Sequence, residues 1–206
     1  MVNNTKYLYR GLGWPTIFTY IRFFTAPYNI LESLVPVSGI IIDLGCGYGI
    51  FANYLGLMQP LRKIIGLELD HKKFCYADRG LSNVKFFHED VANSKIPKAD
   101  AILLIHVLHH LNSFEEQEYL LKNCKEILNT NGSIIIAEVD KKPYVKHILG
   151  WLADKILYPG EEIFYRKPNE FINLFNKLGY KVESVIPAHN KKPFSHIIYI
   201  LKNNDS

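Results

Sequence analysis

The sequence predicts an α/β fold in which helices cover both faces of a doubly wound, mostly parallel sheet. The main observation is an alternation, from Gly39 to Val139, of short runs rich in Ile, Leu and Val with segments of helical spacing. The second observation is size, because 206 residues with 48% hydrophobic and 21% charged side chains suit a single globular domain. Strands that alternate with helices are typical of parallel sheets.

Each element follows from a local pattern. Ile40–Ile42 is a β-branched run followed by glycines, which indicates a buried strand. We expect further strands at Lys63–Leu67, Val84–His88, Ala101–Ile105 and Ser133–Val139. Helices are expected between Pro27 and Pro36 and at Ile50–Leu57, His71–Arg79, Phe114–Leu128 and Pro168–Leu178. Asn131-Gly132 is expected to close the helix at Phe114–Leu128, because glycine favours the left-handed cap.

The remaining segments depart from this alternation. Lys181–Ile186 and His196–Leu201 flank a turn with proline and are expected to form an antiparallel hairpin. Residues 7–26 are aromatic and interrupted by Gly11, Gly13 and Pro15, so we expect irregular structure there. The single domain, 1–206, then consists of an aromatic cap segment at 1–36, a core at 37–140, a helical insert or lid at 141–168, and a C-terminal helix and hairpin at 169–206.

Charge and hydropathy exclude several classes of protein. The net charge is +4 and the basic pairs are scattered, whereas a nucleic-acid binder would concentrate them in a stripe. The three cysteines lack metal-ligand spacing. The N-terminus has no stretch of signal-peptide type, and the longest apolar run, Ala101–Leu111, is too short to span a bilayer. We expect a cytoplasmic protein that binds no nucleic acid, with peripheral membrane contact left open and oligomeric state unspecified.

A glycine-rich loop follows the first strand. Asp43 ends the strand and is followed by Gly45, Gly47 and Gly49 at alternate positions, just before a helix. Glycines let the backbone approach a ligand closely, and a helix N-terminus favours a negatively charged group. The third glycine comes one residue too early for the dinucleotide pattern G-x-G-x-x-G. The loop therefore predicts a nucleotide-like ligand, with NAD(P) as the less favoured candidate.

Two more acids follow the next two strands. Glu68 comes at the end of the second strand, where a carboxylate can accept hydrogen bonds from ribose hydroxyls, with Asp70 as the nearby alternative. Asp90 follows the third strand and could accept from an adenine amino group, with Glu89 as its rival. Because open α/β sheets bind ligands at the carboxyl edge, these acids are expected to share one site.

Five motifs in order resemble those of class I S-adenosylmethionine-dependent methyltransferases. The glycine loop resembles the first motif, Ile65–Glu68 the second and Glu89–Val91 the third. Segments at 99–111 and 128–138 resemble the fourth and fifth, although Asn131 stands where a glycine is usual, and 167–180 is similar to a further segment. The resemblance covers roughly 37–200. It implies a Rossmann-like sheet of seven strands, the last antiparallel, with S-adenosyl-L-methionine as cofactor.

The resemblance also implies roles for individual residues. The glycine loop would shape the methionine end of the cofactor pocket, Glu68 would hold the ribose, and Asp90 with the Val91 backbone would contact the adenine. Ile105 would lie near the sulfonium. The implied cofactor-binding set is Asp43, Gly45, Cys46, Gly47, Gly49, Glu68, Leu69, Asp90, Val91 and Ile105. Cys46 is interpreted as a small buried residue without thiol chemistry.

His106 and Tyr165 are the candidates for a general base, which is needed only if the acceptor keeps a proton. A metal site made of His106, His109 and His110 is disfavoured, because the segment follows a strand end and need not be helical. The resemblance implies an enzyme that requires no metal, since the leaving group is already cationic.

The acceptor is expected to be a small apolar, aromatic or lipid-like molecule. The aromatic residues of 7–24 and an apolar stripe at 144–157 could wall such a pocket, although core packing is the simpler explanation of the stripe. Two other functional classes stay open at this point. One is an NAD(P)-dependent oxidoreductase, and the other is a non-catalytic partner protein that binds the cofactor.

Overall fold

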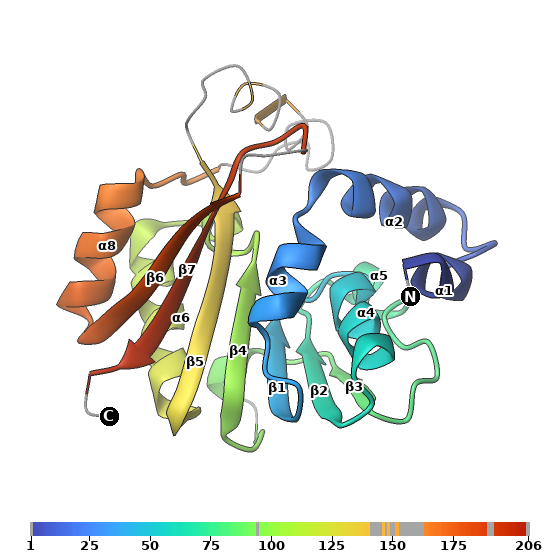
Figure 1. The fold of residues 1–206 in the computed structure, drawn as a ribbon, viewed down its shortest axis with the longest axis horizontal. Coiled ribbons are helices and arrows are strands. Elements are labelled where there is room, and N and C mark those ends of the chain that lie inside the picture. Colours follow the sequence, from blue (N-terminus) through green and yellow to red (C-terminus); the bar gives the residue numbers. More distant parts are fainter. Residues whose placement is uncertain are drawn as a thin grey trace.

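The chain folds into one seven-stranded sheet with helices on both faces (Figure 1). The computed structural model describes residues 2–93, 95–140, 146, 148, 151, 152, 163–188 and 192–204. The strand order is β3-β2-β1-β4-β5-β7-β6, and β7 pairs antiparallel with both β5 and β6. The predicted doubly wound sheet with an antiparallel last strand is confirmed.

The strands are β1 (Gly39–Leu44), β2 (Arg62–Leu67), β3 (Val84–Phe87), β4 (Ala99–Ile105), β5 (Leu128–Val139), β6 (Tyr180–Ala188) and β7 (His196–Asn203). The helices are α1 (Val2–Leu8), α2 (Trp14–Thr25), α3 (Tyr28–Leu34), α4 (Ile50–Met58), α5 (His71–Phe74), α6 (Phe114–Glu126) and α8 (Pro168–Lys177), with 3-10 turns at Val91–Asn93 and Leu108–His110.

Alternation of side chains along the strands builds two cores. Ile41 and Leu103 point to the face covered by α1 to α4, whereas their neighbours Ile42 and Leu104 point to the face covered by α6 and α8. All four side chains are fully buried. Because successive residues of a strand point to opposite faces, a continuous aliphatic run is what a sheet buried on both sides requires. The two cores together hold the carboxyl ends of β1 to β4 at one edge.

The N-terminal segment differs from the irregular structure we expected. Trp14–Thr25 is a regular helix, and a second helix, Val2–Leu8, precedes it. The glycines do separate the two helices, because Gly13 has φ 68° at the start of α2. Pro15, however, lies in the first turn of the helix, where a missing N–H costs nothing. The expectation of irregular structure was wrong because proline was interpreted as a helix breaker.

Two further boundaries correct the expectations. The α-helix after Asp70 ends at Phe74 rather than Arg79, and the side chain of Asn53 donates to the Ala77 carbonyl at 2.8 Å, which holds the following turn against α4. Asn131-Gly132 lies inside β5 and does not cap α6. A Cβ on Gly132 would come within 2.9 Å of the Ala99 carbonyl oxygen, so glycine serves the close approach of β5 to β4.

The predicted helical insert at 141–168 lies mostly outside the described residues. Within 141–162 these are Lys146, Ile148, Trp151 and Leu152, and 163–167 precede α8 without regular structure. None of the helices described is both long enough and apolar enough to traverse a bilayer.

Candidate functional site

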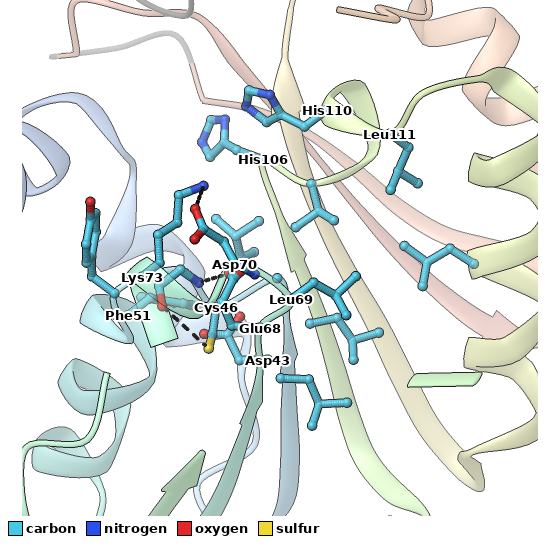
Figure 2. A pocket seen from close by; sticks show the side chains of 18 of the residues that line it. Asp43, Cys46, Phe51, Glu68, Leu69, Asp70, Lys73, His106, His110 and Leu111 are labelled. Carbon is cyan, nitrogen blue, oxygen red and sulfur yellow. Dashed lines mark hydrogen bonds and ion pairs between the residues drawn. The ribbon is translucent and has the colours of Figure 1, made fainter. Parts of the chain in front are cut away.

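A cavity of about 760 Å³ opens at the carboxyl edge of the sheet. It lies within the range of roughly 300–1,000 Å³ that is usual for small-molecule sites. Its walls come from α2, α3, α4 and α6 and from the segments that follow β1 to β4. Figure 2 shows that side chains far apart in the sequence, among them Asp43, Glu68 and His106, converge there.

The glycine loop forms one wall of this cavity. Gly47 has φ 59°, and a Cβ built on it would meet no atom within 4 Å. The open space beside Gly47 therefore leaves the backbone accessible to a ligand. Gly49 does not line the cavity. It precedes α4 in the left-handed conformation, and its missing Cβ makes room for the ring of Phe86.

Asp43 places a buried carboxyl group beneath the loop. It is 3% exposed at the end of β1. Burial, followed by the nearby charge of Glu68, raises the pKa of Asp43 to about 7, and the Arg22 guanidinium opposes this rise. Cys46 lines the same cavity, and burial raises the pKa of its thiol well above the usual range. The carboxyl group of Asp43 therefore changes its protonation state near neutral pH, whereas Cys46 stays a neutral thiol.

Glu68 is held by the backbone at the end of β2. Its Oε2 atom accepts a hydrogen bond from the Gly47 N–H at 2.6 Å, and Oε1 accepts from the Asp70 N–H at 2.8 Å. The side chain is 8% exposed and lines the cavity. Asp70, the alternative we considered, instead caps α5 and pairs with Lys73 at 3.6 Å (Figure 2). Both acids line the cavity, but Glu68 is the one whose carboxylate accepts from the glycine loop.

The far end of the cavity lies beyond β3. Asp90 and Val91 both line it, and Oδ1 of Asp90 accepts from the Ala92 N–H at 3.0 Å. Across from them, α6 contributes Asn123, whose Nδ2 atom is buried with no hydrogen-bond partner among the described residues. Leu69, which is 64% exposed, lines the cavity between these ends. Asn123 could not be identified from the sequence, because the helical pattern alone does not show which side of α6 faces a ligand.

Ile105 ends β4, His106 follows it, and both line the cavity. His106 has φ 60°, the one positive value of a non-glycine residue in the described part of the chain. Such a conformation costs of order 1 kcal/mol and is often found at functional sites. Nε2 of His106 is buried and has no hydrogen-bond partner among the described residues. Burial and then the charge of Arg22 hold the pKa of His106 well below its usual value, so its ring is neutral.

The other residues of the histidine segment have different surroundings. His109 is 1% exposed and hydrogen-bonds to Glu138, the acid near the end of β5. Tyr165 stacks on His109 with ring centroids 5.1 Å apart, and it is absent from the cavity wall. His110 does line the cavity. No group of three His, Cys, Asp or Glu side chains in the described part of the chain has the arrangement of a metal site.

The opposite wall comes from a segment that precedes the five motifs found in the sequence. Phe18, Ile21, Arg22 and Thr25 form one side of α2 and line the cavity, joined by Tyr28 from α3. Their spacing of three and four residues is the signal that could have identified this helix face. It was missed because aromatic and β-branched residues are weak helix formers.

Comparison with known proteins gives the class to which this fold and cavity belong. A family model for a methyltransferase domain matches residues 22–185, so the chain belongs to the methyltransferase domain family. O-methyltransferase 12 of Dictyostelium discoideum is 27% identical over 162 residues, which cover 74% of this chain and 42% of that protein. Chavicol O-methyltransferase of Ocimum basilicum is 31% identical over 154 residues, covering 72% and 42%. The chain spans less than half the length of these curated relatives.

Solved structures share the fold. DhpI in its complex with SAH has a TM-score of 0.70 at 17% identity, covering 100% of this chain and 96% of that chain. Mitomycin 7-O-methyltransferase MmcR has a TM-score of 0.72 at 20% identity, covering 92% and 56%. The predicted Rossmann-like methyltransferase fold is thereby confirmed. The match to the methyltransferase family decides against the alternative of an NAD(P)-dependent oxidoreductase.

Proposed function

We propose that the protein transfers a methyl group from S-adenosyl-L-methionine to a hydroxyl group of a small apolar or aromatic molecule. The observation that carries this proposal is one continuous cavity with two chemically different parts. One part has the buried carboxyl groups of Asp43 and Glu68 beside a glycine loop, and the other has the apolar wall of α2. A donor and an acceptor could therefore lie side by side.

The residues of the first part fit the cofactor. The open backbone at Gly47 and the buried Asp43 suit the amino-acid end, and the backbone-held Glu68 can accept from the ribose hydroxyls. Asp90, Val91 and Asn123 suit the adenine, since a carboxylate and a buried amide offer both acceptor and donor atoms. When bound, S-adenosyl-L-methionine supplies a methyl group on a cationic sulfur atom.

The second part fits an apolar acceptor. Phe18, Ile21, Tyr28, Val139 and Phe194 contribute aromatic and aliphatic surface to the wall. These residues would exclude water and hold the acceptor in line with the methyl group, which is where most of the rate enhancement of a displacement arises. The names of similar proteins support this choice: chavicol O-methyltransferase is one, and NcsB1 was solved with 2-hydroxy-5-methyl naphthoic acid. A lipid-like acceptor is also apolar and would suit the same wall.

His106 is our candidate for contact with the acceptor hydroxyl group. Its neutral Nε2 can accept a hydrogen bond from that group, but the low pKa of His106 makes it a weak general base. Tyr165 drops out of this role because it is absent from the cavity wall. The proton of the acceptor would therefore leave to solvent, with His106 orienting the oxygen towards the methyl group.

We expect His106→Gly to lower kcat about 10- to 100-fold while the affinity for the cofactor changes by less than about twofold. Glycine tolerates the positive φ of this position, so the variant should keep the local backbone conformation. Turnover with the acceptor found by screening and calorimetric titration with S-adenosylhomocysteine measure the two effects. An unchanged kcat would remove His106 from the mechanism.

The proposed function is tested by titrating the purified protein with S-adenosylmethionine, S-adenosylhomocysteine and NAD⁺ in a calorimeter. A panel of phenols, hydroxylated aromatic acids and fatty acids is then screened with methyl-labelled cofactor. We expect binding of the first two ligands and label transfer to a member of the phenol group. Binding without transfer to any acceptor, together with a stable complex with another protein, would favour a non-catalytic partner protein. Absence of cofactor binding would contradict the proposal entirely.

A further inference from the structure

Arg22 is a cation of the cavity wall that precedes all five motifs found in the sequence. It lies on α2, on the same side as Phe18 and Thr25, and the side chain is partly buried. Its guanidinium group affects Asp43 and His106 in the same direction, because it lowers the pKa of both. The positive charge of Arg22 therefore acts on Asp43 at the donor end of the cavity and on His106 at the acceptor end.

Tyr28 gives Arg22 a fixed neighbour. Nε of Arg22 donates to the Tyr28 hydroxyl at 3.4 Å, and the guanidinium carbon lies 5.9 Å from the centre of the same ring. Tyr28 is 4% exposed and stacks on Phe51 with centroids 4.6 Å apart, so it is itself held rigidly. These contacts restrict the orientation of the guanidinium plane at the cavity wall.

At its amino-acid end, S-adenosyl-L-methionine has a positive α-ammonium group and a negative α-carboxylate group attached to the same carbon atom. Asp43 is the buried acid at that end and can neutralise the α-ammonium group. The α-carboxylate must then lie next to Asp43, where burial would make an unpaired negative charge costly. A cation close to Asp43 is needed to complete the site.

Among the described residues, the cavity wall contains two side chains with a permanent positive charge, Arg22 and Lys73. Lys73 pairs with Asp70 at 3.6 Å, on the segment that follows Glu68 and the ribose position (Figure 2). Arg22 is the one of the two that lowers the pKa of Asp43. A guanidinium group also matches a carboxylate with two parallel hydrogen bonds, which an ammonium group cannot do.

We propose, on the basis of the function proposed above, that Arg22 binds the α-carboxylate of the cofactor's methionine portion. Asp43 and Arg22 then hold the ammonium and carboxylate groups of one amino acid between β1 and α2. The N-terminal helix thus takes part in donor binding as well as in walling the acceptor space.

The test compares two ligands that differ in this amino acid. S-adenosylhomocysteine carries the carboxylate, whereas 5′-methylthioadenosine has the same adenosine and sulfur atoms without it. Calorimetry gives the affinity of each ligand for the wild type, Arg22→Met and Arg22→Lys. We expect Arg22→Met to lose about 10- to 100-fold affinity for S-adenosylhomocysteine and less than about twofold for 5′-methylthioadenosine, with Arg22→Lys in between.

Two further variants serve as controls. Arg10→Met makes the same chemical change at an exposed turn outside the cavity wall and should alter neither affinity. Lys73→Met removes the second cation of the cavity. If this variant changes the ratio of the affinities for S-adenosylhomocysteine and 5′-methylthioadenosine as much as Arg22→Met does, the effect comes from charge alone and direct binding by Arg22 is overturned.

Equal losses for both ligands in Arg22→Met would assign Arg22 a structural role and overturn the proposal. Unchanged affinities for both would also overturn it, because Arg22 would then face the acceptor or solvent. Wild-type protein that binds neither ligand would instead contradict the proposed function, so the two failures are distinguishable.

Discussion

Asp43→Asn is expected to stabilise the ligand-free protein and at the same time to impair cofactor binding. The pKa of Asp43 is raised from 3.8 to about 7, mainly by burial. Between these values the folded protein binds a proton that the unfolded chain has lost, so the free energy of unfolding falls as the pH rises from about 4 to about 7. Asparagine has no such penalty and should gain about 2–4 kcal/mol at pH 8.

The gain should shrink as the pH falls, and chemical denaturation at pH 5.5 and pH 8 measures it. Denaturation curves that show the same difference between variant and wild type at both pH values would contradict the assignment of the buried charge to Asp43.

Binding should change in the opposite direction. Because the ionised carboxylate neutralises the ammonium group of the ligand, wild-type affinity for S-adenosylhomocysteine should rise about tenfold per pH unit up to about pH 7 and then level off. Asp43→Asn should lose this pH dependence and about 2–4 kcal/mol of binding free energy, roughly 30- to 1,000-fold in affinity. Calorimetry across pH 5.5–8.5 checks both. Variant and wild type with the same pH profile would exclude Asp43 as the titrating group.

Arg62→Met is expected to lower the free energy of unfolding by about 3–5 kcal/mol, because it leaves buried partners behind. Arg62 is 1% exposed at the start of β2. It pairs with Glu32 at 3.0 Å and donates to the carbonyl oxygens of Pro36 at 2.7 Å and Val35 at 3.0 Å. These contacts tie the segment after α3 to the sheet, at the end opposite the cavity.

Urea denaturation of the variant measures this effect, and Lys177→Met is the matched control. Lys177 also pairs with a glutamate, Glu118, at 2.9 Å, but its side chain is 66% exposed. An exposed pair contributes about 0–1 kcal/mol, so the control should remain near wild-type stability. A loss below about 1 kcal/mol in Arg62→Met would show that the buried pair does not hold α3 against the sheet.

The donor part of the cavity was predictable from the sequence because its residues come directly after strands. Runs such as Ile40–Ile42 identify a buried parallel strand, and parallel strands bring the residues after them to one edge of the sheet. Asp43, Glu68 and Asp90 do line one cavity. The sequence left the choice between Glu68 and Asp70 open, since it depends on which carboxylate the Gly47 N–H reaches.

The acceptor part was much less predictable. The aromatic residues of 7–24 were expected to wall a pocket, but Pro15 and the aromatic residues around it obscured the helical spacing of α2, so Arg22 could not be placed on the same wall as Phe18. Tyr165, the other candidate for a general base, stacks on His109 and is not among the residues that line the cavity. Such placements depend on contacts between distant segments, which local patterns do not encode.

The most direct test of this account is a crystal structure of the protein with S-adenosylhomocysteine. We predict the ligand along the carboxyl edge of the sheet, with its ammonium group at Asp43, its ribose at Glu68, its adenine between Asp90 and Asn123, and its sulfur atom facing His106. A ligand bound outside the cavity, or bound in the reverse direction with the adenine at Asp43, would contradict the account.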